Sequence, residues 1–127
     1  MSGYVLPAGT GETYRWHESR TVFKATAAQT AGQVAVMEGT YPAGLVVPAH
    51  VHDGEDEMFY LLDGRIAGFC DDDRWTAGPG DFVFVPRDRP HGFTVLDGRP
   101  ATALVLVGPP RLDGQIAAGG VRLPAPG

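Results

Sequence analysis

The chain has 127 residues, of which 43% are hydrophobic, and a formal net charge of −5. This length suits one compact domain with its own core and leaves no room for a second, so we interpret residues 1–127 as a single domain. The ten basic residues form no run, which argues against a nucleic-acid partner or an anionic membrane surface.

Cysteine content and hydropathy indicate in which cellular compartment the protein is expected. Cys70 is the only cysteine, so an intramolecular disulfide is excluded. The first residues lack the basic region and the apolar region of a secretory signal. No apolar run approaches the roughly 20 residues of a membrane-spanning helix. We therefore expect a cytoplasmic protein without a membrane partner.

Eighteen glycines and eleven prolines break the chain into short apolar stretches, a pattern typical of many short strands joined by tight turns. The first 20 residues show no clean periodicity. Strands are then predicted at 21–27, 33–41, 45–52, 57–62, 65–70, 82–86, 91–96 and 101–107. The tail, 108–127, is rich in glycine and proline and is predicted to lack regular structure. Eight strands suit a jelly roll, so the predicted fold class is all-β.

Three connections, at 30–32, 63–64 and 97–98, each contain a glycine that can adopt a positive φ. The strands on either side of each connection are expected to pair antiparallel. The stretch 82–85, Phe-Val-Phe-Val, is apolar at every position, so we expect both its faces to be covered. The barrel interior would cover one face and a further layer or partner subunit the other, which predicts a homodimer.

Three of the four histidines belong to one arrangement with a glutamate. His50 and His52 are two residues apart, so on a strand they share a face about 6.6 Å apart along the backbone. His91 starts a later strand and can enter the same cavity from the opposite side. With the carboxylate of Glu57, these imidazoles predict one transition-metal site.

Glu57 lies at an odd offset from His52, but Asp53–Gly54 offers a turn that restarts the strand alternation. The rival carboxylates Asp53, Glu55 and Asp56 are expected to lie in that turn and be solvated. Glu57, at the start of the next strand, is the predicted ligand.

The predicted alternation also indicates which side chains line the pocket. Phe59 and Leu61 share the face of Glu57, and Phe93 and Val95 share the face of His91. Such an apolar lining suits a flat aromatic or polyketide-like molecule.

These residues resemble the motifs of the cupin family. Gly44, five residues, His50-Val51-His52, four residues, Glu57, six residues and Gly64 match the first cupin motif in full. Gly80, five residues, Pro86, Asp88 and His91 resemble the second motif, in which Asp88 replaces an expected Gly and Val95 an Asn that is often found. The resemblance covers residues 44–95. It implies a conical double-stranded β-helix (jelly-roll) barrel in which His50, His52, Glu57 and His91 bind one divalent metal ion.

Four protein ligands leave one or two positions open on a metal that accepts five or six. Within the family, residues 50–93 are similar to the quercetin-dioxygenase-like group. That resemblance implies a redox metal (Fe, Ni, Mn or Cu), a deprotonated aromatic or enolisable substrate, and Glu57 as ligand and catalytic base. Two alternatives stay open. One is a redox-neutral zinc cupin such as a polyketide cyclase or isomerase, and the other is a small-molecule-binding cupin without turnover.

Further charged residues have less specific interpretations. His17, beside Trp16, is interpreted as a surface residue rather than a proton shuttle. Arg87 and Arg89 flank the turn before His91 and are expected to pair with Asp88 or solvent. The alternative is that they receive an anionic substrate at the pocket rim.

Overall fold

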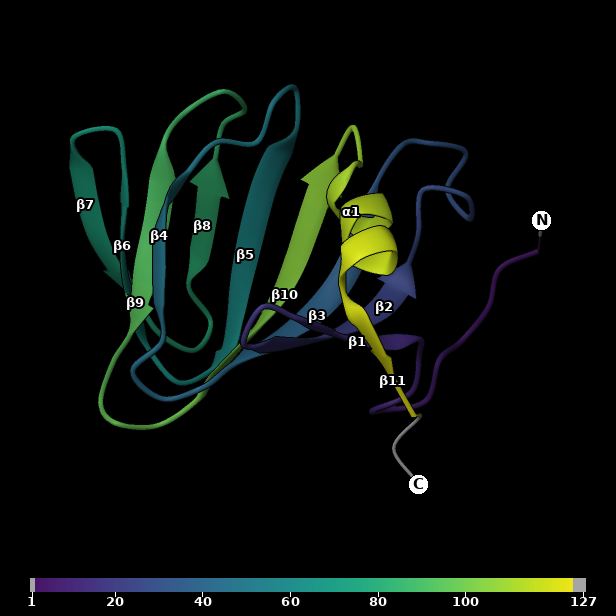
Figure 1. The fold of residues 1–127 in the computed structure, drawn as a ribbon, viewed down its shortest axis with the longest axis horizontal. Coiled ribbons are helices and arrows are strands. Elements are labelled where there is room, and N and C mark those ends of the chain that lie inside the picture. Colours follow the sequence, from purple (N-terminus) through teal and green to yellow (C-terminus); the bar gives the residue numbers. More distant parts are fainter. Residues whose placement is uncertain (1, 125–127) are drawn as a thin grey trace.

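The computed structural model describes residues 2–124 and consists of two antiparallel β-sheets with one short helix among those residues (Figure 1). The larger sheet has seven strands in the order β11-β1-β2-β3-β10-β5-β8, and the smaller has four in the order β4-β9-β6-β7. The strands are β1 (Thr13–Trp16), β2 (Ser19–Ala25), β3 (Ala35–Tyr41), β4 (Val46–His50), β5 (Asp56–Asp63), β6 (Ile66–Cys70), β7 (Asp73–Ala77), β8 (Phe82–Val85), β9 (His91–Val95), β10 (Ala101–Gly108) and β11 (Val121–Leu123). This architecture is the predicted jelly roll.

All eight predicted strands are present, with ends that differ by no more than two residues from the prediction. The signal that found them was the division of the chain by glycines and prolines into short apolar stretches. The structure shows how such stretches pack. In β10, for example, every second side chain from Ala101 to Val107 is buried and the intervening ones are partly exposed. The core lies between the two sheets and includes Met37, Leu61 and Val85.

The predictions for the two ends of the chain were wrong. The first 20 residues contain β1, which forms a hairpin with the beginning of β2. The tail contains helix α1 (Leu112–Gly119) and β11, which pairs with β1. Pro124 is described outside these elements, and residues 125–127 lie outside the described part. Strand β7, hairpin partner of β6, was also missed.

The three turn glycines have the predicted backbone conformation, with φ of 74° at Gly32, 74° at Gly64 and 61° at Gly98. Only the first of these turns joins paired neighbours, β2 and β3. The other two connect β5 to β6 and β9 to β10, which lie in different sheets, so the expected antiparallel pairing there was wrong. At Gly64 a Cβ atom would lie 2.4 Å from the Pro100 carbonyl oxygen, so this crossing requires glycine.

Strand β8 has one buried and one exposed face in the isolated chain. Val83 and Val85 are buried, whereas Phe82 is 60% exposed and Phe84 is 52% exposed. Within residues 2–124 the barrel interior therefore covers one face of this edge strand, as predicted, and no further layer covers the other. Cover of that second face by a partner subunit stays a prediction.

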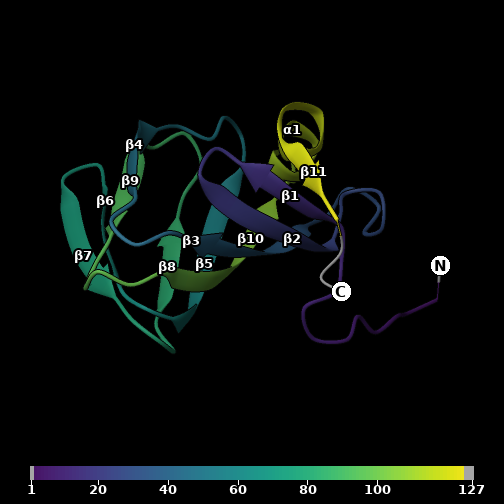
Figure 2. The ribbon, with the colours of Figure 1, turned by 60° about the horizontal axis from the view of Figure 1, so that its bottom comes forward.

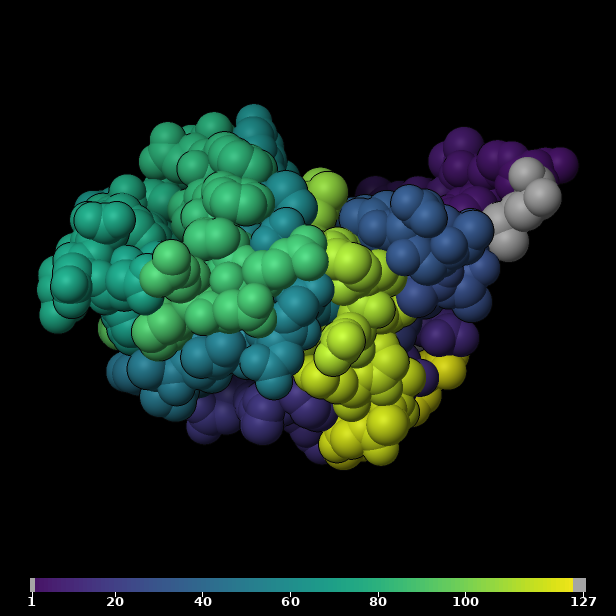
Figure 3. Space-filling view, turned by 90° about the horizontal axis from the view of Figure 1, so that it is seen from above, coloured from purple at the N-terminus to yellow at the C-terminus, as the bar shows by residue number. Residues whose placement is uncertain are grey.

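Helix α1 lies across one end of the sheets, as Figures 1 and 2 show. Viewed from above, it is seated between the teal and green segments and the blue segment that precedes β3 (Figure 3). Ile116 is 1% exposed. The Asp113 carboxylate accepts a hydrogen bond of 2.8 Å from the backbone N–H of Ala27 in the blue segment. No helix within residues 2–124 combines the length and apolarity that crossing a membrane requires.

Candidate metal centre

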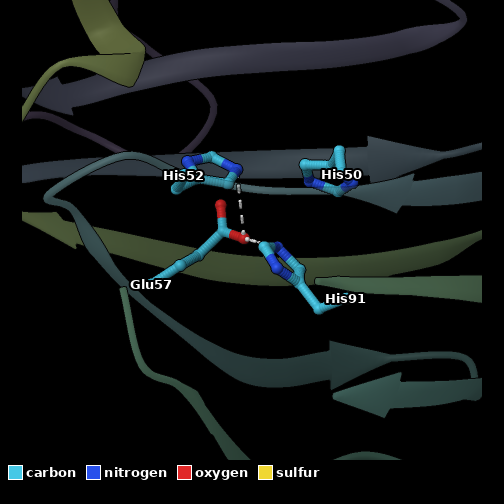
Figure 4. Close-up of side chains that lie close together, drawn as sticks. All are labelled: His50, His52, Glu57 and His91. Carbon is cyan, nitrogen blue, oxygen red and sulfur yellow. Dashed lines mark hydrogen bonds and ion pairs between the residues drawn. The ribbon is translucent and has the colours of Figure 1, made fainter. Parts of the chain in front are cut away.

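Four side chains that the sequence singled out converge at one place between the sheets (Figure 4). His50 ends β4 and His91 begins β9, and the two residues are register partners. His52 follows β4, and Glu57 is the second residue of β5. One ligand atom from each of the four lies within 4.8 Å of the others. The predicted turn at Asp53–Gly54 brings this about, with Gly54 at a φ of 67°.

The four residues differ in burial. His91 is 2% exposed and Glu57 is 4% exposed, so both belong to the core. His50 and His52 are half-buried. The cluster therefore has two members deep in the barrel and two that are partly exposed.

Hydrogen bonds determine which nitrogen of each imidazole is free. His50 Nδ1 lies 2.9 Å from the Pro48 carbonyl oxygen, and His91 Nδ1 lies 3.0 Å from the Arg89 carbonyl oxygen. Because a carbonyl oxygen only accepts, both Nδ1 atoms donate, and the Nε2 lone pairs remain available in the neutral rings. His52 Nδ1 is 2.7 Å from a carboxylate oxygen of Glu55, which imposes the same tautomer.

The donor set fits a cation. Oε1 of Glu57 lies 3.1 Å from His91 Nε2 and 3.7 Å from His52 Nε2 (Figure 4). With the imidazole protons on Nδ1, all three of these atoms carry lone pairs that face one another. Such an arrangement requires a proton or a metal ion between them. Three imidazole nitrogens and one carboxylate oxygen suit a divalent transition metal.

A cavity of about 710 Å³ opens beside the cluster. Its wall includes all of the cluster except His91, together with Phe59 and Phe93, as predicted. Leu61 and Val95 do not line it. They are 1% and 3% exposed and pack in the core, so this part of the pocket prediction was wrong. The other lining residues include Met37, Tyr41 and Val105 on the inner face of the large sheet, Trp16, His17 and Glu18 at the β1–β2 turn, and Arg111 and Gln115 of the α1 segment.

A family model described as a cupin domain matches residues 37–107, more than half of the chain. This chain belongs to the cupin family. Quercetin 2,3-dioxygenase of Bacillus subtilis (strain 168) is 30% identical to this cupin over 90 residues, which cover 71% of the chain and 27% of the dioxygenase. Dimethylsulfoniopropionate lyase DddQ of Ruegeria pomeroyi is 41% identical over 66 residues, which cover 51% of the chain and 32% of the lyase. The chain thus spans less than a third of the length of either protein.

Among solved structures, the polyketide cyclase RemF from Streptomyces resistomycificus has a TM-score of 0.70 with this cupin at 22% identity. The match covers 87% of this chain and 82% of the cyclase. At that level of identity the likeness concerns the fold.

Glu55 differs most from its prediction. Instead of being solvated it is 2% exposed. One carboxylate oxygen contacts His52 Nδ1, and the other accepts hydrogen bonds from the backbone N–H groups of Arg111, at 2.5 Å, and Leu112, at 2.8 Å. Burial alone would raise the pKa of Glu55, but these hydrogen bonds lower it overall. Glu55 therefore connects a candidate ligand to the start of α1.

The charged turns beside the cluster also differ from expectation. Arg87 pairs with Asp56 at 3.2 Å and Arg89 with Asp71 at 3.4 Å, rather than with Asp88. The Arg87 hydrogen bonds lower the pKa of Asp56. Asp88, where this cupin departs from the family glycine, has a φ of 66° and accepts a hydrogen bond from the backbone N–H of Gly54. That bond compensates for a side chain at a position whose backbone favours glycine.

The surroundings of the cluster affect its imidazoles unequally. Burial lowers the pKa of His50, which keeps its ring in the neutral form that binds metal. Burial has the same effect at His52, but the Glu55 hydrogen bond and the charge of Glu57 raise its pKa overall.

His17 is exposed at the cavity mouth, where its ring lies 4.4 Å from the Trp16 ring centroid.

Proposed function

We propose that this cupin is a metal-dependent enzyme that acts on an aromatic or enolisable small molecule, in the manner of a quercetinase-like dioxygenase. The observation that carries the proposal is the convergence of three Nε2 lone pairs and one carboxylate oxygen beside an open cavity of about 710 Å³. Four protein ligands leave one or two coordination positions for a substrate oxygen.

The dioxygenase form of the proposal is supported by the similarity to quercetin 2,3-dioxygenase and by the aromatic wall of Phe59 and Phe93. A redox metal (Fe, Ni, Mn or Cu) would supply the reaction of the substrate with dioxygen. The chain's own residues would bind and orient the substrate. Glu57 would take the proton of an enol or phenol, because its carboxylate lines the cavity and is otherwise shielded from solvent.

A second candidate is redox-neutral chemistry with zinc, as in a cyclase, an isomerase or a lyase. It is favoured by the 41% identity to DddQ, a lyase, over 66 residues. The same four ligands suit zinc, which acts as a Lewis acid on a carbonyl oxygen. In this second mechanism Glu57 would again transfer a proton of the substrate.

Elemental analysis and oxygen dependence distinguish these proposals. The protein would be purified without added metal, its metal content measured, and flavonol substrates supplied with and without dioxygen. We expect a redox metal and substrate loss only with dioxygen. Zinc with oxygen-independent turnover would support the second candidate. Tight binding of small molecules without turnover under either condition would instead indicate a binding protein and contradict both.

A further inference from the structure

Two hydroxyl groups lie on the same part of the cavity wall, away from the candidate ligands. Thr21 on β2 and Tyr41 at the end of β3 both line the cavity. Thr21 is the register partner of Gly39, and Gly39 precedes Tyr41 by two positions, so all three share the inner face.

The Tyr41 ring lies back over Gly39. A Cβ atom on Gly39 would be 2.6 Å from the Tyr41 hydroxyl oxygen, so this tyrosine orientation needs a glycine. The ring is also held edge-on against Phe93, with 5.1 Å between the ring centroids. The Tyr41 hydroxyl therefore lies above Gly39, directly beside the strand position of Thr21.

Within residues 2–124 neither hydroxyl makes a hydrogen bond to protein. Ser19, two residues before Thr21, differs because its hydroxyl donates to the Trp16 carbonyl oxygen at 2.7 Å. That part of the chain contains no sealed polar side-chain atom without a partner, so the oxygens of Thr21 and Tyr41 open into the cavity. The surrounding wall, which includes Met37 and Val105, is apolar. A partner is needed there, because unpaired hydroxyls in apolar surroundings are costly.

We propose that Thr21 and Tyr41 form a hydrogen-bonding subsite for a second oxygen atom of the substrate. The inference rests on the proposed function and specifies its substrate class. The substrate carries one oxygen for the metal and another for this hydroxyl pair, joined by a ring-bearing body that contacts Phe59 and Phe93. A carbonyl, carboxylate or phenolic oxygen would accept hydrogen bonds from both hydroxyls.

The sheet register gives the part of the separation between the two ends that runs along the strands, to which the two-strand step from β5 to β3 adds. Glu57 is level with Ala35 through Val107, and Gly39 is four residues further along β3. Four residues correspond to roughly 13 Å along the strands, before the side chains reach into the cavity. This separation suits a molecule with oxygens at both ends of a ring system. Burial, and the charge of Glu57, raise the pKa of Tyr41, so its hydroxyl keeps the proton that it donates.

Binding measurements on the zinc-loaded protein without dioxygen test this subsite. The probes are quercetin and 3-hydroxyflavone, which share the metal-chelating group but differ in hydroxyl groups on the distal rings. We expect Thr21→Val and Tyr41→Phe each to weaken quercetin binding about fivefold and to leave 3-hydroxyflavone unchanged. Thr21→Ser, which keeps the hydroxyl, is the matched control. Equal effects on both probes, or no effect on quercetin, would overturn the proposal.

A crystal structure of the metal-loaded protein separates this inference from the activity. We expect a water or ligand oxygen within hydrogen-bonding distance of both hydroxyls, even if no flavonol is turned over or bound. Density that shows Thr21 and Tyr41 bonded only to each other would overturn the subsite and leave the dioxygenase proposal intact. An occupied subsite in a protein that turns over no flavonol would support the subsite and contradict the dioxygenase proposal.

Discussion

At the scale of single residues, the partners of the three Nδ1 atoms determine how easily a substitution can change the orientation and tautomer of each imidazole. His50 and His91 donate to backbone carbonyls, which a substitution elsewhere does not remove. His52 depends on the side chain of Glu55. Glu55 is in turn held by two backbone N–H groups at the start of α1. The orientation of His52 is therefore the point at which the metal centre can be changed without removing a ligand.

We expect Glu55→Gln to weaken metal binding about 10- to 100-fold. A glutamine oxygen can still accept the hydrogen bonds from the Arg111 and Leu112 N–H groups, but its NH₂ group would then face His52 Nδ1. Two donors cannot pair, so His52 would move its proton to Nε2 and lose the lone pair that binds metal. Competition with a chromogenic chelator measures the affinity.

Asp56→Asn is the matched control for that experiment, because Asp56 is the next residue and pairs with Arg87 outside the cluster. Its metal affinity should equal that of the wild type. If Glu55→Gln also binds metal with wild-type affinity, Glu55 does not orient His52.

Removal of His91 tests the ligand set itself. We expect His91→Ala to abolish metal uptake, because the buried imidazole is lost from a site of only four donors. His17→Ala removes a histidine at the cavity mouth and should retain a full metal content in the same elemental analysis. Equal metal content in both variants would show that His91 is not a ligand.

The sequence predicted the convergence of His50, His52, Glu57 and His91 because strand alternation and one glycine turn are local signals. It did not reveal Glu55, although the residue lies inside the same motif. The partners of Glu55 include backbone N–H groups 56 and 57 residues later, and no local pattern encodes such a contact. The spacing of residues in the sequence cannot predict hydrogen bonds to backbone groups that are distant along the chain.

At the scale of elements, α1 is hydrogen-bonded to two segments that are distant from each other in the sequence. Its first residues hold Glu55 in the loop before β5, and Asp113 holds Ala27 in the segment before β3. Of the residues of this helix, Asp113 and Ile116 are buried. Ile116 therefore provides the main apolar anchor.

We expect Ile116→Ala to reduce the free energy of unfolding by about 2–5 kcal/mol, the usual cost of this truncation at a buried site. Urea titration followed by circular dichroism measures the change. Gln115→Ala, at the neighbouring exposed position of the same helix, should change the stability by less than about 0.5 kcal/mol. A similarly small effect of Ile116→Ala would mean that α1 does not contribute to the stable core.

The elements that the sequence missed share a physical reason. In β11 the residues are exposed or half-buried without alternation, and the strand exists through its pairing with β1. In α1 the glycines 114 and 119 lower the helix propensity, and its apolar face is narrow. These elements are stabilised by tertiary contacts, whereas the eight predicted strands are short apolar stretches bounded by turn residues, a local signal.

At the scale of the whole molecule, the large sheet has two faces with different roles. Alternation on β5 places Glu57 and Phe59 inside, and Met58 and Tyr60 outside. We define the outer patch as Met58, Tyr60, Phe82 and Phe84, which pair across β5 and β8. Tyr60, Phe82 and Phe84 are 44%, 60% and 52% exposed. An apolar patch of this kind, without a charged side chain among its members, is typical of an interaction surface.

We expect a second copy of the chain to cover the outer patch. A two-fold axis would stack the same rows of side chains against each other, which needs no complementary charges and leaves the cavity on the opposite face accessible. The wild type should therefore have a mass about twice 13.5 kDa in light scattering. Phe84→Glu should give the monomer mass with unchanged metal content, because two facing carboxylates cannot be buried together. Val121→Glu, at a 52% exposed position on the distant strand β11, should remain dimeric. A monomeric wild type, or a dimeric Phe84→Glu variant, would place the patch outside any interface between copies.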